Sequence, residues 1–481
     1  MKEYDLIAIG TGSAMNIVEA MLSSNPDLRI AVVDKDDPGG ICLTKACIPT
    51  KRLVYPADLV RLVQAAGEHG ITAPLERIDF SSIMERMRRS IGREIEHIRQ
   101  GLQQTENVDY YQETARFIGP YQMRVGKETI TAEQIFLCLG SRPAIPEIAG
   151  LDQVAYHTSD TILGIDRLPE RLTIVGGGYV AAEFGHFFSA MGSEVTILGR
   201  NPQLLPGEEP EVSALAKRML GRWMTVRSNH EVTAVEPLPS EEAVRVKALD
   251  RGTGESMHVD TEALLIASGR APNSDILQPE RSGVQTDARG WIAVNDYLET
   301  SKENIWAFGD ANGKHLYKHV ANYESQVVFE NAVLGKKTPV DYGAVPRAVF
   351  THPEIASVGQ KEREAVAQLG RDKVMIGFNR FEDTARGQAM GVRGCFAKII
   401  LEEGTGRILG AHIIGPQASV LIQEIITLMS TRERSIVPAM NAMHIHPGLS
   451  EVIQGALSEF LSPEDYAHML THLFPEDFPA S

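Results

Sequence analysis

Two segments of the sequence repeat one pattern, an apolar strand followed by a glycine-rich turn and a helix. The first runs from Asp5–Ile9 into the turn Gly10–Met15, and the second runs from Leu172–Val175 into the turn Gly176–Ala181. In such a unit the glycines let the backbone approach a pyrophosphate, and the free N–H groups at the start of the helix bind it. One glycine pair also suits an ordinary tight turn, but two copies in the same context predict two dinucleotide sites. Two dinucleotides in one chain suggest a flavin and a nicotinamide.

The length of 481 residues allows about three domains. From Ala344 onward the glycine pattern is missing, and strands are expected at Ala348–Thr351, Val374–Phe378 and Phe396–Leu401, with a helix around Ser419–Thr431. This mixture predicts an α+β interface domain. A stripe of apolar residues from Ile83 to Leu102 recurs every three or four positions and predicts one long helix used for packing.

Charge and hydropathy exclude several classes of partner. The formal net charge is −16, whereas nucleic-acid binding needs concentrated lysine and arginine. No apolar run approaches the roughly 20 residues of a membrane span. The N-terminus has no basic segment followed by a long apolar core, so no cleaved signal is expected. We therefore expect a cytoplasmic protein with neither a nucleic-acid nor a membrane partner.

The chain has four cysteines, of which two carry the expected chemistry. Cys138 and Cys395 lie in apolar stretches and are expected to be buried and inert. Cys42 and Cys47 lie five apart in the segment Gly39–Lys51, before a proline that suits the start of a helix. A thiolate at a helix N-terminus has a lowered pKa and is reactive near neutral pH. Two further ligands for zinc are missing, so no metal is expected and a redox-active disulfide is favoured over two unconnected thiols.

The segment Gly39–Lys51 resembles the redox-active signature of the class I pyridine nucleotide–disulfide oxidoreductases. This family includes dihydrolipoamide dehydrogenase, glutathione reductase and mycothione reductase, and the resemblance extends from Tyr4 to about Leu461. It implies that Cys42 exchanges with the substrate and that Cys47 faces the flavin as a thiolate. It also implies that Lys51 lies beside the flavin and pairs with Glu183, because a buried lysine is costly without a carboxylate.

The dipeptide His446-Pro447, with Glu451 five residues after the histidine, resembles the catalytic pair near the C-terminus of the family. A histidine can transfer protons to and from a thiol, and a carboxylate on its other ring nitrogen fixes the tautomer. In the family this histidine completes the site of the partner subunit. The resemblance therefore implies an obligate homodimer, with a supporting role for His444.

The resemblance also assigns residues to the two coenzymes. The positions expected to bind FAD are Gly10, Gly12, Ser13, Asp34, Lys35, Gly40, Lys51, Gly140, Ser141, Asp310, Tyr317, His319 and Ala321. The positions expected to bind NAD(P) are Gly176, Gly178, Tyr179, Val180, Glu183, Arg200 and Gly269.

Two departures from the family pattern bear on the chemistry. Arg200 stands where members specific for NAD have an acid, which favours NADPH or the use of both coenzymes. Lys45 precedes the second cysteine in place of the usual valine. Its ammonium either stabilises a thiolate or points to solvent, and the sequence favours neither.

The expected fold is α/β, with two Rossmann-like dinucleotide-binding domains and a C-terminal α+β dimerisation domain. The expected boundaries are 1–150 for the first part of the FAD domain, 151–274 for the NAD(P) domain, 275–343 for the second, central FAD part, and 344–481 for dimerisation. The last range includes an extension from about Ser462 to Ser481 that contains no cysteine. We expect a loosely docked terminus there rather than a cover for the substrate cleft.

Three functions remain open at this point. The first and favoured one is a dihydrolipoamide dehydrogenase, in which dihydrolipoyl groups pass electrons through Cys42–Cys47 and FAD to NAD(P)+. The second is an NADPH-dependent reductase of a low-molecular-weight disulfide, similar to mycothione reductase, which stretches such as Lys318–Asn322 resemble. The third is a flavoprotein subunit that passes electrons to a protein partner.

Overall fold

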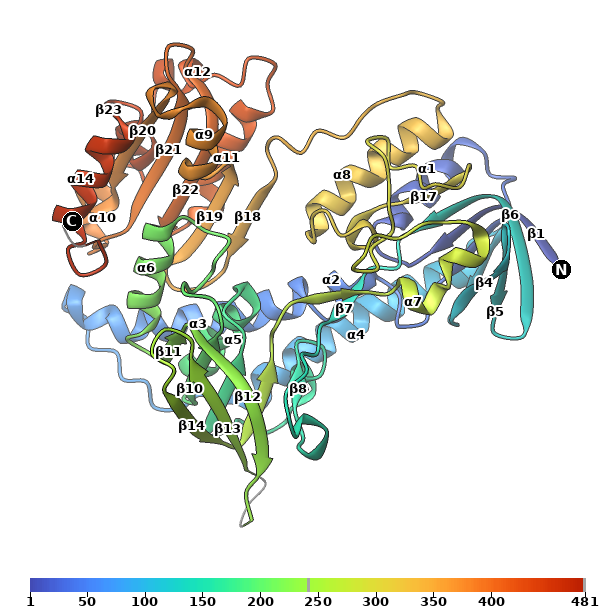
Figure 1. The fold of residues 1–481 in the computed structure, drawn as a ribbon, viewed down its shortest axis with the longest axis horizontal. Coiled ribbons are helices and arrows are strands. Elements are labelled where there is room, and N and C mark those ends of the chain that lie inside the picture. Colours follow the sequence, from blue (N-terminus) through green and yellow to red (C-terminus); the bar gives the residue numbers. More distant parts are fainter. Residues whose placement is uncertain (240–242, 479–481) are drawn as a thin grey trace.

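The computed structural model describes residues 1–239 and 243–478, which form an α/β molecule in three parts (Figure 1). The two ends of the described chain lie on different parts, the N-terminus on the first and the C-terminal region on the third. The first part is built on a seven-stranded sheet in the order β3-β2-β1-β6-β5-β4, with β17 also pairing to β6. Its strands are β1 (Lys2–Ile9), β2 (Ile30–Val33), β3 (Val108–Tyr111), β4 (Ala115–Gly119), β5 (Gln122–Val125), β6 (Glu128–Leu137) and β17 (Ile305–Ala307).

The centre of this sheet is parallel and buried on both faces. β1 pairs in parallel with β2 and with β6, and Leu6, Ile7 and Ala8 have no exposed surface. A strand covered on both faces is apolar at successive positions, as this one is. Helices α1 (Ala14–Ser24) and α8 (Lys318–Val328) share one core cluster with these strands, so two segments far apart in the sequence cover the same face.

The second part repeats the arrangement with a five-stranded sheet in the order β11-β10-β9-β15-β8. Its strands are β8 (His157–Thr158), β9 (Arg171–Val175), β10 (Glu194–Gly199), β11 (Thr225–Ser228) and β15 (Ala263–Ile266). Helix α5 (Tyr179–Met191) follows the second glycine turn, as the sequence predicts, and α6 (Pro210–Leu220) follows β10. A three-stranded sheet of β12 (His230–Pro237), β13 (Val244–Asp250) and β14 (Ser256–Thr261) extends from it, and β7 (Ser141–Pro143) pairs with β16 (Arg270–Pro272).

The third part is a six-stranded antiparallel sheet with helices packed on it. Its strands are β18 (Pro346–Val349), β19 (Glu354–Gly359), β20 (Val374–Arg380), β21 (Phe396–Glu402), β22 (Arg407–Gly415) and β23 (Phe460–Leu461). Its helices are α9 (Glu362–Leu369), α10 (Ala385–Ala389), α11 (Ala418–Met429), α12 (Val437–Asn441), α13 (Glu451–Ala456) and α14 (Pro463–Leu473). The first expected strand, Ala348–Thr351, lies two residues earlier, because the backbone N–H of Phe350 donates to Glu183 Oε1 at 3.1 Å instead of joining the sheet.

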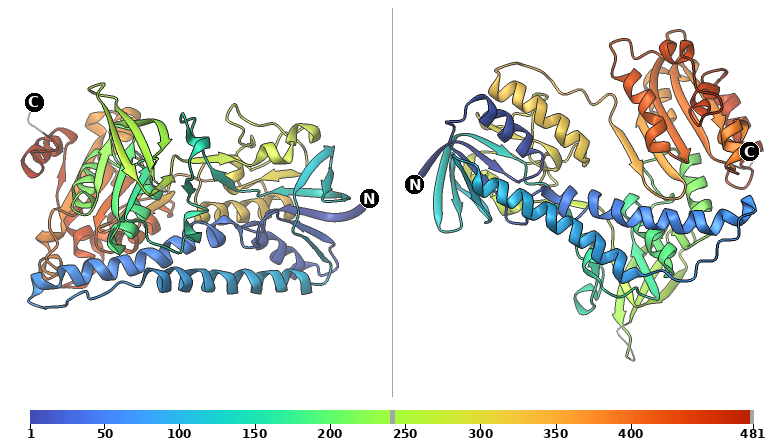
Figure 2. Two further views of the ribbon diagram at one scale, coloured as in Figure 1. Left: turned by 90° about the horizontal axis from the view of Figure 1, so that it is seen from below. Right: turned by 180° about the vertical axis from the view of Figure 1, so that it is seen from behind.

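Three helices connect the first two parts, namely α2 (Gly40–Thr44), α3 (Cys47–Ala65) and α4 (Phe80–Gln104). The long apolar stripe predicted from the sequence lies on α4, where Met84, Met87 and Ile91 are buried. Figure 2 shows α4 extending beside α3, which in turn packs against α5. The start of α3 is thereby held between the first and second parts. Among the helices of residues 1–239 and 243–478, none is long and apolar enough to cross a membrane.

The C-terminal extension is not loosely docked as expected, but forms α14. Tyr466 is 1% exposed and its hydroxyl donates to Glu211 Oε1 at 2.8 Å. The same carboxylate accepts from the fully buried Lys398 Nζ at 2.6 Å, and Lys398 also donates to Glu362 Oε2 at 2.7 Å. This charge cluster ties the extension to α6 of the second part and to the six-stranded sheet. Residues 479–481 of the extension lie outside the described residues.

Candidate active site

One cavity of about 710 Å³ brings most of the predicted site residues together. Segments of all three parts line it, including the first glycine turn, the start of α3, α5, α8 and α11. The predicted residues on its wall are Gly10, Gly12, Ser13, Asp34, Lys35, Gly40, Cys42, Cys47, Lys51, Gly140, Ser141, Tyr179, Val180, Glu183, Asp310, Tyr317, His319 and Ala321. The predicted residues that do not line it are Gly176, Gly178, Arg200, Gly269, His446 and Glu451.

The first glycine turn leaves the start of α1 open toward the cavity. Gly10 has φ +103°, and a Cβ there would collide with the carbonyl oxygen of Cys138. A Cβ on Gly40 would lie 2.7 Å from the Cα of Gly12, so the two turns meet backbone to backbone. Asp34 accepts from the backbone N–H of Thr11 at 2.9 Å, which fixes the turn. These residues form the cradle that a dinucleotide pyrophosphate requires and fit the FAD expected there.

A chain of polar groups continues along the cavity wall from Asp310. Ser141 Oγ donates to Asp310 Oδ2 at 2.5 Å, and Arg270 Nε donates to Ser141 Oγ at 2.8 Å. Burial raises the pKa of the Asp310 carboxyl above its usual range. His319 Nε2 lies 2.8 Å from the carbonyl oxygen of Pro346, so this nitrogen is the donor of the ring. A buried carboxylate with an open side suits the hydroxyl groups of a ribityl chain.

The two reactive cysteines lie on either side of the break between α2 and α3. Both are thiols in this structure, and Cys47 is the first residue of α3. The hydrogen bond that Cys42 donates, together with the Lys51 ammonium, lowers the pKa of Cys47 to about 7. The same hydrogen bond raises the pKa of Cys42 far above its usual range. Cys47 is therefore the sulfur that carries negative charge near neutral pH.

The expected pairing of Lys51 with Glu183 is present. Lys51 Nζ donates to Oε1 and Oε2 of Glu183 at 2.8 and 2.7 Å, and the ammonium lies 4.6 Å from the centre of the Phe350 ring. The Glu183 side chain is 5% exposed and also accepts from the backbone of Phe350. A carboxylate held from two sides fixes the lysine on the side of the cavity where α3 meets α5.

Two further lysines line the cavity and were not assigned a role from the sequence. Lys45, for which the sequence left a thiolate and solvent equally open, pairs with Asp36 at 3.1 Å. Lys318 is half-buried at the first position of α8, and its Nζ donates to Ser13 Oγ at 2.9 Å. No signal in the sequence predicts this contact, because Ser13 and Lys318 are 305 positions apart.

The residues expected to bind the nicotinamide coenzyme surround the second glycine turn. A Cβ on Gly176 would collide with the carbonyl oxygen of Ala267, which explains the glycine there. Tyr179 and Val180 begin α5 and line the cavity, and Tyr179 is 40% exposed. Arg200 follows β10 with an exposed side chain, so its guanidinium is available to a ligand.

His446 and Glu451 form the predicted pair, but away from the thiols of their own chain. His446 Nδ1 lies 2.6 Å from Glu451 Oε1, and the hydrogen bond to His446 lowers the pKa of the glutamate. The His446 side chain is 73% exposed. Met443 and Ile445 beside it are 100% and 78% exposed, and His444 contacts Glu424 at 3.1 Å. A proton-transfer pair beside exposed apolar side chains is typical of a surface that another subunit covers.

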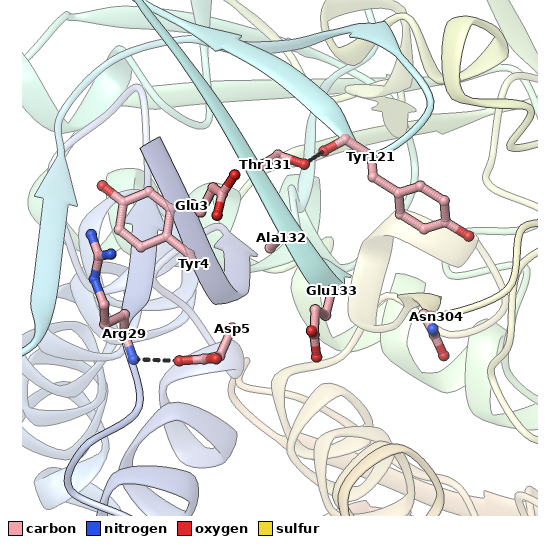
Figure 3. Close-up of a pocket in the computed structure, with 9 residues that line it drawn as sticks. All are labelled: Glu3, Tyr4, Asp5, Arg29, Tyr121, Thr131, Ala132, Glu133 and Asn304. Atoms are coloured by element: carbon pink, nitrogen blue, oxygen red, sulfur yellow. Dashed lines mark hydrogen bonds between the residues drawn. The ribbon is translucent and has the colours of Figure 1, made fainter. Parts of the chain in front are cut away.

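A second pocket, of about 720 Å³, lies at the far end of the first sheet (Figure 3). It is lined by Glu3, Tyr4, Asp5, Arg29, Tyr121, Thr131, Ala132, Glu133 and Asn304. None of these is a predicted site residue, and no sulfur lies in it. No described residue of the C-terminal extension lines either cavity. The chemistry of the chain therefore belongs to the cavity that holds the thiols.

Two protein families match the chain in succession. Residues 4–328 match the pyridine nucleotide-disulphide oxidoreductase family, and residues 345–457 match its dimerisation domain. The second match supports a homodimer.

Individual relatives agree with this assignment. The chain is 37% identical over 472 residues to a mycothione reductase of Mycobacterium tuberculosis, covering 95% of this chain and 99% of the relative. It is 32% identical over 482 residues to a dihydrolipoyl dehydrogenase of Synechocystis sp., covering 94% and 98%. The structure of the HOCl-induced flavoprotein disulfide reductase RclA from Escherichia coli superposes with a TM-score of 0.83 at 26% identity, covering 95% and 100%. The chain belongs to the pyridine nucleotide-disulphide oxidoreductase family and is an oxidoreductase that uses FAD and a nicotinamide coenzyme.

Proposed function

We propose that the chain is an NADPH-dependent reductase of a low-molecular-weight disulfide, with Cys42 and Cys47 as its redox-active pair. The observation that carries this proposal is the position of Cys47, the more acidic thiol, beside Cys42 and the Lys51–Glu183 ion pair in one cavity. The exposed Arg200 supports a coenzyme with a 2′-phosphate. The higher identity to a mycothione reductase than to dihydrolipoyl dehydrogenases also supports this direction, so the order of preference from the sequence is reversed.

The roles of the residues follow from their chemistry. FAD, held by the first glycine turn and Asp310, would supply the two-electron chemistry that connects NADPH to the sulfur pair. The Cys42–Cys47 bond then breaks, which leaves Cys47 as the thiolate and Cys42 as the thiol that donates to it. Lys51, fixed by Glu183, balances the negative charge that develops beside the flavin.

The substrate disulfide is then cleaved in two exchange steps. His446 of the partner subunit takes the proton of the Cys42 thiol, and the Cys42 thiolate attacks one substrate sulfur to form a mixed disulfide. The first substrate thiolate leaves and receives the same proton back from His446 of the partner subunit. The Cys47 thiolate next attacks the sulfur of Cys42, which restores the Cys42–Cys47 bond and releases the second thiolate, which takes a proton from water. In sum one NADPH and one proton convert one disulfide into two thiols.

Two other functions compete with this one. In the first, the same residues catalyse the reverse reaction, which oxidises dihydrolipoyl groups and reduces NAD(P)+. The dihydrolipoyl dehydrogenase relatives support this alternative. The electrons could also pass to a protein partner, in which case small disulfides would not be turned over.

The deciding experiment is steady-state turnover of the purified FAD-loaded enzyme in both directions. NADPH or NADH is supplied with mycothione disulfide, glutathione disulfide or lipoamide, and dihydrolipoamide is supplied with NAD+ or NADP+. We expect the fastest turnover with NADPH and a low-molecular-weight disulfide. Cys42→Ser serves as the control, since its flavin is still reduced by NADPH while disulfide turnover is lost. Faster oxidation of dihydrolipoamide than reduction of any disulfide would contradict the proposal.

A further inference from the structure

The loop that joins β10 to α6, residues 200–209, lies where the adenosine end of the nicotinamide coenzyme is expected. It begins with Arg200, the residue expected to meet a 2′-phosphate. Further along, the backbone N–H of Leu205 donates to the carbonyl oxygen of Gly177, in the second glycine turn, at 2.7 Å. The position of the loop 200–209 therefore bears on Arg200 and on the turn expected to hold the coenzyme pyrophosphate.

The loop contains a backbone conformation that its own sequence does not favour. Leu205 has φ +52°, in the left-handed region that residues other than glycine rarely adopt. Its side chain is 3% exposed and belongs to the same core cluster as Val212 and Leu215 of α6. A strained residue of this kind persists only where the surrounding contacts impose its conformation.

The contact at the far end of the loop comes from Arg347, on β18 of the third part. Its Nε donates to Glu208 Oε1 at 2.8 Å, and its Nη2 donates to the carbonyl oxygen of Gly207 at 2.9 Å. The Glu208 side chain is 5% exposed and that of Arg347 is 21% exposed. The planar guanidinium lets one side chain hold a carboxylate and a backbone carbonyl together, which a lysine cannot do.

Two further side chains of the third part hold the same stretch. Ser357 Oγ, on β19, donates to Glu208 Oε2 at 2.8 Å. Lys361 Nζ, just before α9, donates to the carbonyl oxygen of Pro206 at 3.1 Å. Three consecutive residues, 206–208, are thus fixed directly after the strained Leu205. Arg347 also lines the thiol cavity, so it lies between the loop 200–209 and the site of the thiols.

We infer that Arg347 is a positioning residue for the nicotinamide coenzyme and acts by holding the loop 200–209 in its binding conformation before the coenzyme arrives. Ordering a loop costs conformational entropy, so a loop already ordered in the free enzyme binds its ligand more tightly. The inference rests on the coenzyme site of the proposed function. It adds to that site a residue of the third part, which approaches the loop from outside the second part.

The test measures the affinity of the oxidised, FAD-loaded enzyme for NADP+ and for NAD+ by isothermal titration calorimetry. We expect Arg347→Met to raise the Kd of the coenzyme that the wild-type enzyme prefers by about 10-fold, as for the loss of one hydrogen bond to a charged group. In stopped-flow reduction of the flavin by NADPH, the half-saturating concentration should rise while the limiting rate stays unchanged. Arg347→Lys, which keeps the charge but not the two-armed donor, should restore the affinity only in part.

Arg245→Met is the matched control. Arg245 also holds a carboxylate with two donors, from Nε to Asp260 Oδ1 at 2.7 Å and from Nη2 to Asp260 Oδ2 at 2.8 Å, but it does so on the three-stranded sheet. Its variant should bind the coenzyme as the wild-type enzyme does. If Arg347→Met fails to fold because Glu208 is left buried and unpaired, the double variant Arg347→Met/Glu208→Gln removes both charges and should show the same loss of affinity.

Two results would overturn the inference. The first is an unchanged Kd in Arg347→Met or, where that variant does not fold, in the double variant. The second is an equal rise of the Kd in Arg245→Met, which would show a general effect on the second part. The binding measurement needs no disulfide, so it is separate from the proposed reaction. Absence of turnover with every small disulfide would contradict the proposed function and leave these Kd values unchanged.

Discussion

The difference between Cys42 and Cys47 arises from three neighbours of Cys47. It begins a helix, it accepts a hydrogen bond from Cys42, and Lys51 lies one helical turn further along α3. All three stabilise its anion. Cys42 lies within the five-residue helix α2, and its proton is held between the two sulfurs. In the proposed function these two thiols would divide their work, with Cys47 holding charge beside the flavin and Cys42 meeting the substrate.

The first prediction concerns the pH dependence of Cys47. The pKa of Cys47 is about 7, so its thiolate is present above pH 7 and is lost as the pH falls below that value. Anaerobic titration of the two-electron-reduced enzyme should show long-wavelength thiolate–flavin absorbance with this midpoint. Cys42→Ala should raise the midpoint, because the largest cause of the lowered pKa is removed. Cys395→Ala, a buried thiol in the third part, should leave it unchanged, and a constant midpoint in Cys42→Ala would refute the assignment.

The second prediction concerns Arg200. If its guanidinium binds a 2′-phosphate, Arg200→Met should lower kcat/KM for NADPH by about 10- to 100-fold, the value of a charged hydrogen bond of about 1.5–3 kcal/mol. The value for NADH, which lacks the phosphate, should not fall. Steady-state kinetics with both coenzymes measure the ratio. Equal losses for both coenzymes would show that Arg200 acts on the fold rather than on the phosphate.

At the scale of residues, the sequence predicts pairs that belong to a motif and misses those that depend on the packing of distant segments. The Lys51–Glu183 pair is predicted because both residues stand at fixed places in recognised motifs. The pairing of Lys45 with Asp36 is missed, because the sequence weighed only a thiolate and solvent for this ammonium. The contact of Lys318 with Ser13 is missed because the two residues are 305 positions apart, and only the packing of α1 on α8 joins them.

At the scale of elements, α14 shows how a terminal helix is fixed by a few buried contacts. Tyr466 and Leu470 face the core, and Arg218 of α6 pairs with Asp477 at 3.0 Å beyond the helix end. The sequence of the extension contains apolar residues, but it does not show where they pack. The residue that binds Tyr466, Glu211, is 255 positions away. The expectation of a loose terminus fails for this reason. The glycine-turn helices, whose partners are local strands, are predicted closely.

The third prediction tests this docking. Tyr466→Phe removes the hydroxyl that donates to the buried Glu211 carboxylate and should destabilise the enzyme by about 2 kcal/mol, the value of a hydrogen bond to a charged group. Calorimetry should show a lower Tm while flavin reduction by NADPH is unchanged, since no described residue of α14 lines the cavity. Tyr55→Phe, at a tyrosine that is 64% exposed, is the control and should not change Tm. An unchanged Tm in Tyr466→Phe would contradict the structural role.

At the scale of the whole molecule, the site of one chain is incomplete. Its cavity contains both thiols but not His446, which is exposed with apolar neighbours on the third part. The fold class and the order of the parts follow from the two glycine motifs and the change of pattern after Ala344. From the sequence, the assembly of two subunits is implied only by the resemblance to the family. A single sequence does not specify which surface of a second copy covers His446.

The fourth prediction tests completion of the site by the partner. Cys42→Ser and His446→Gln should each abolish disulfide turnover as pure dimers. A mixed dimer, purified with two different tags, pairs the intact Cys42 of one chain with the intact His446 of the other and should recover about half the activity per dimer, one site of two. The control replaces the Cys42→Ser chain by one that carries both changes. No recovery in the first mixture would show that the histidine does not act across the interface.

The buried cluster around Lys398 limits how the enzyme can open. A hinge motion that swung the second part away from the six-stranded sheet would separate Lys398 from Glu211 and leave charges buried without partners, a cost of several kcal/mol. Rigid-body rotation is thus an expensive route for admitting the coenzyme. The second part and the six-stranded sheet should therefore behave as one rigid frame.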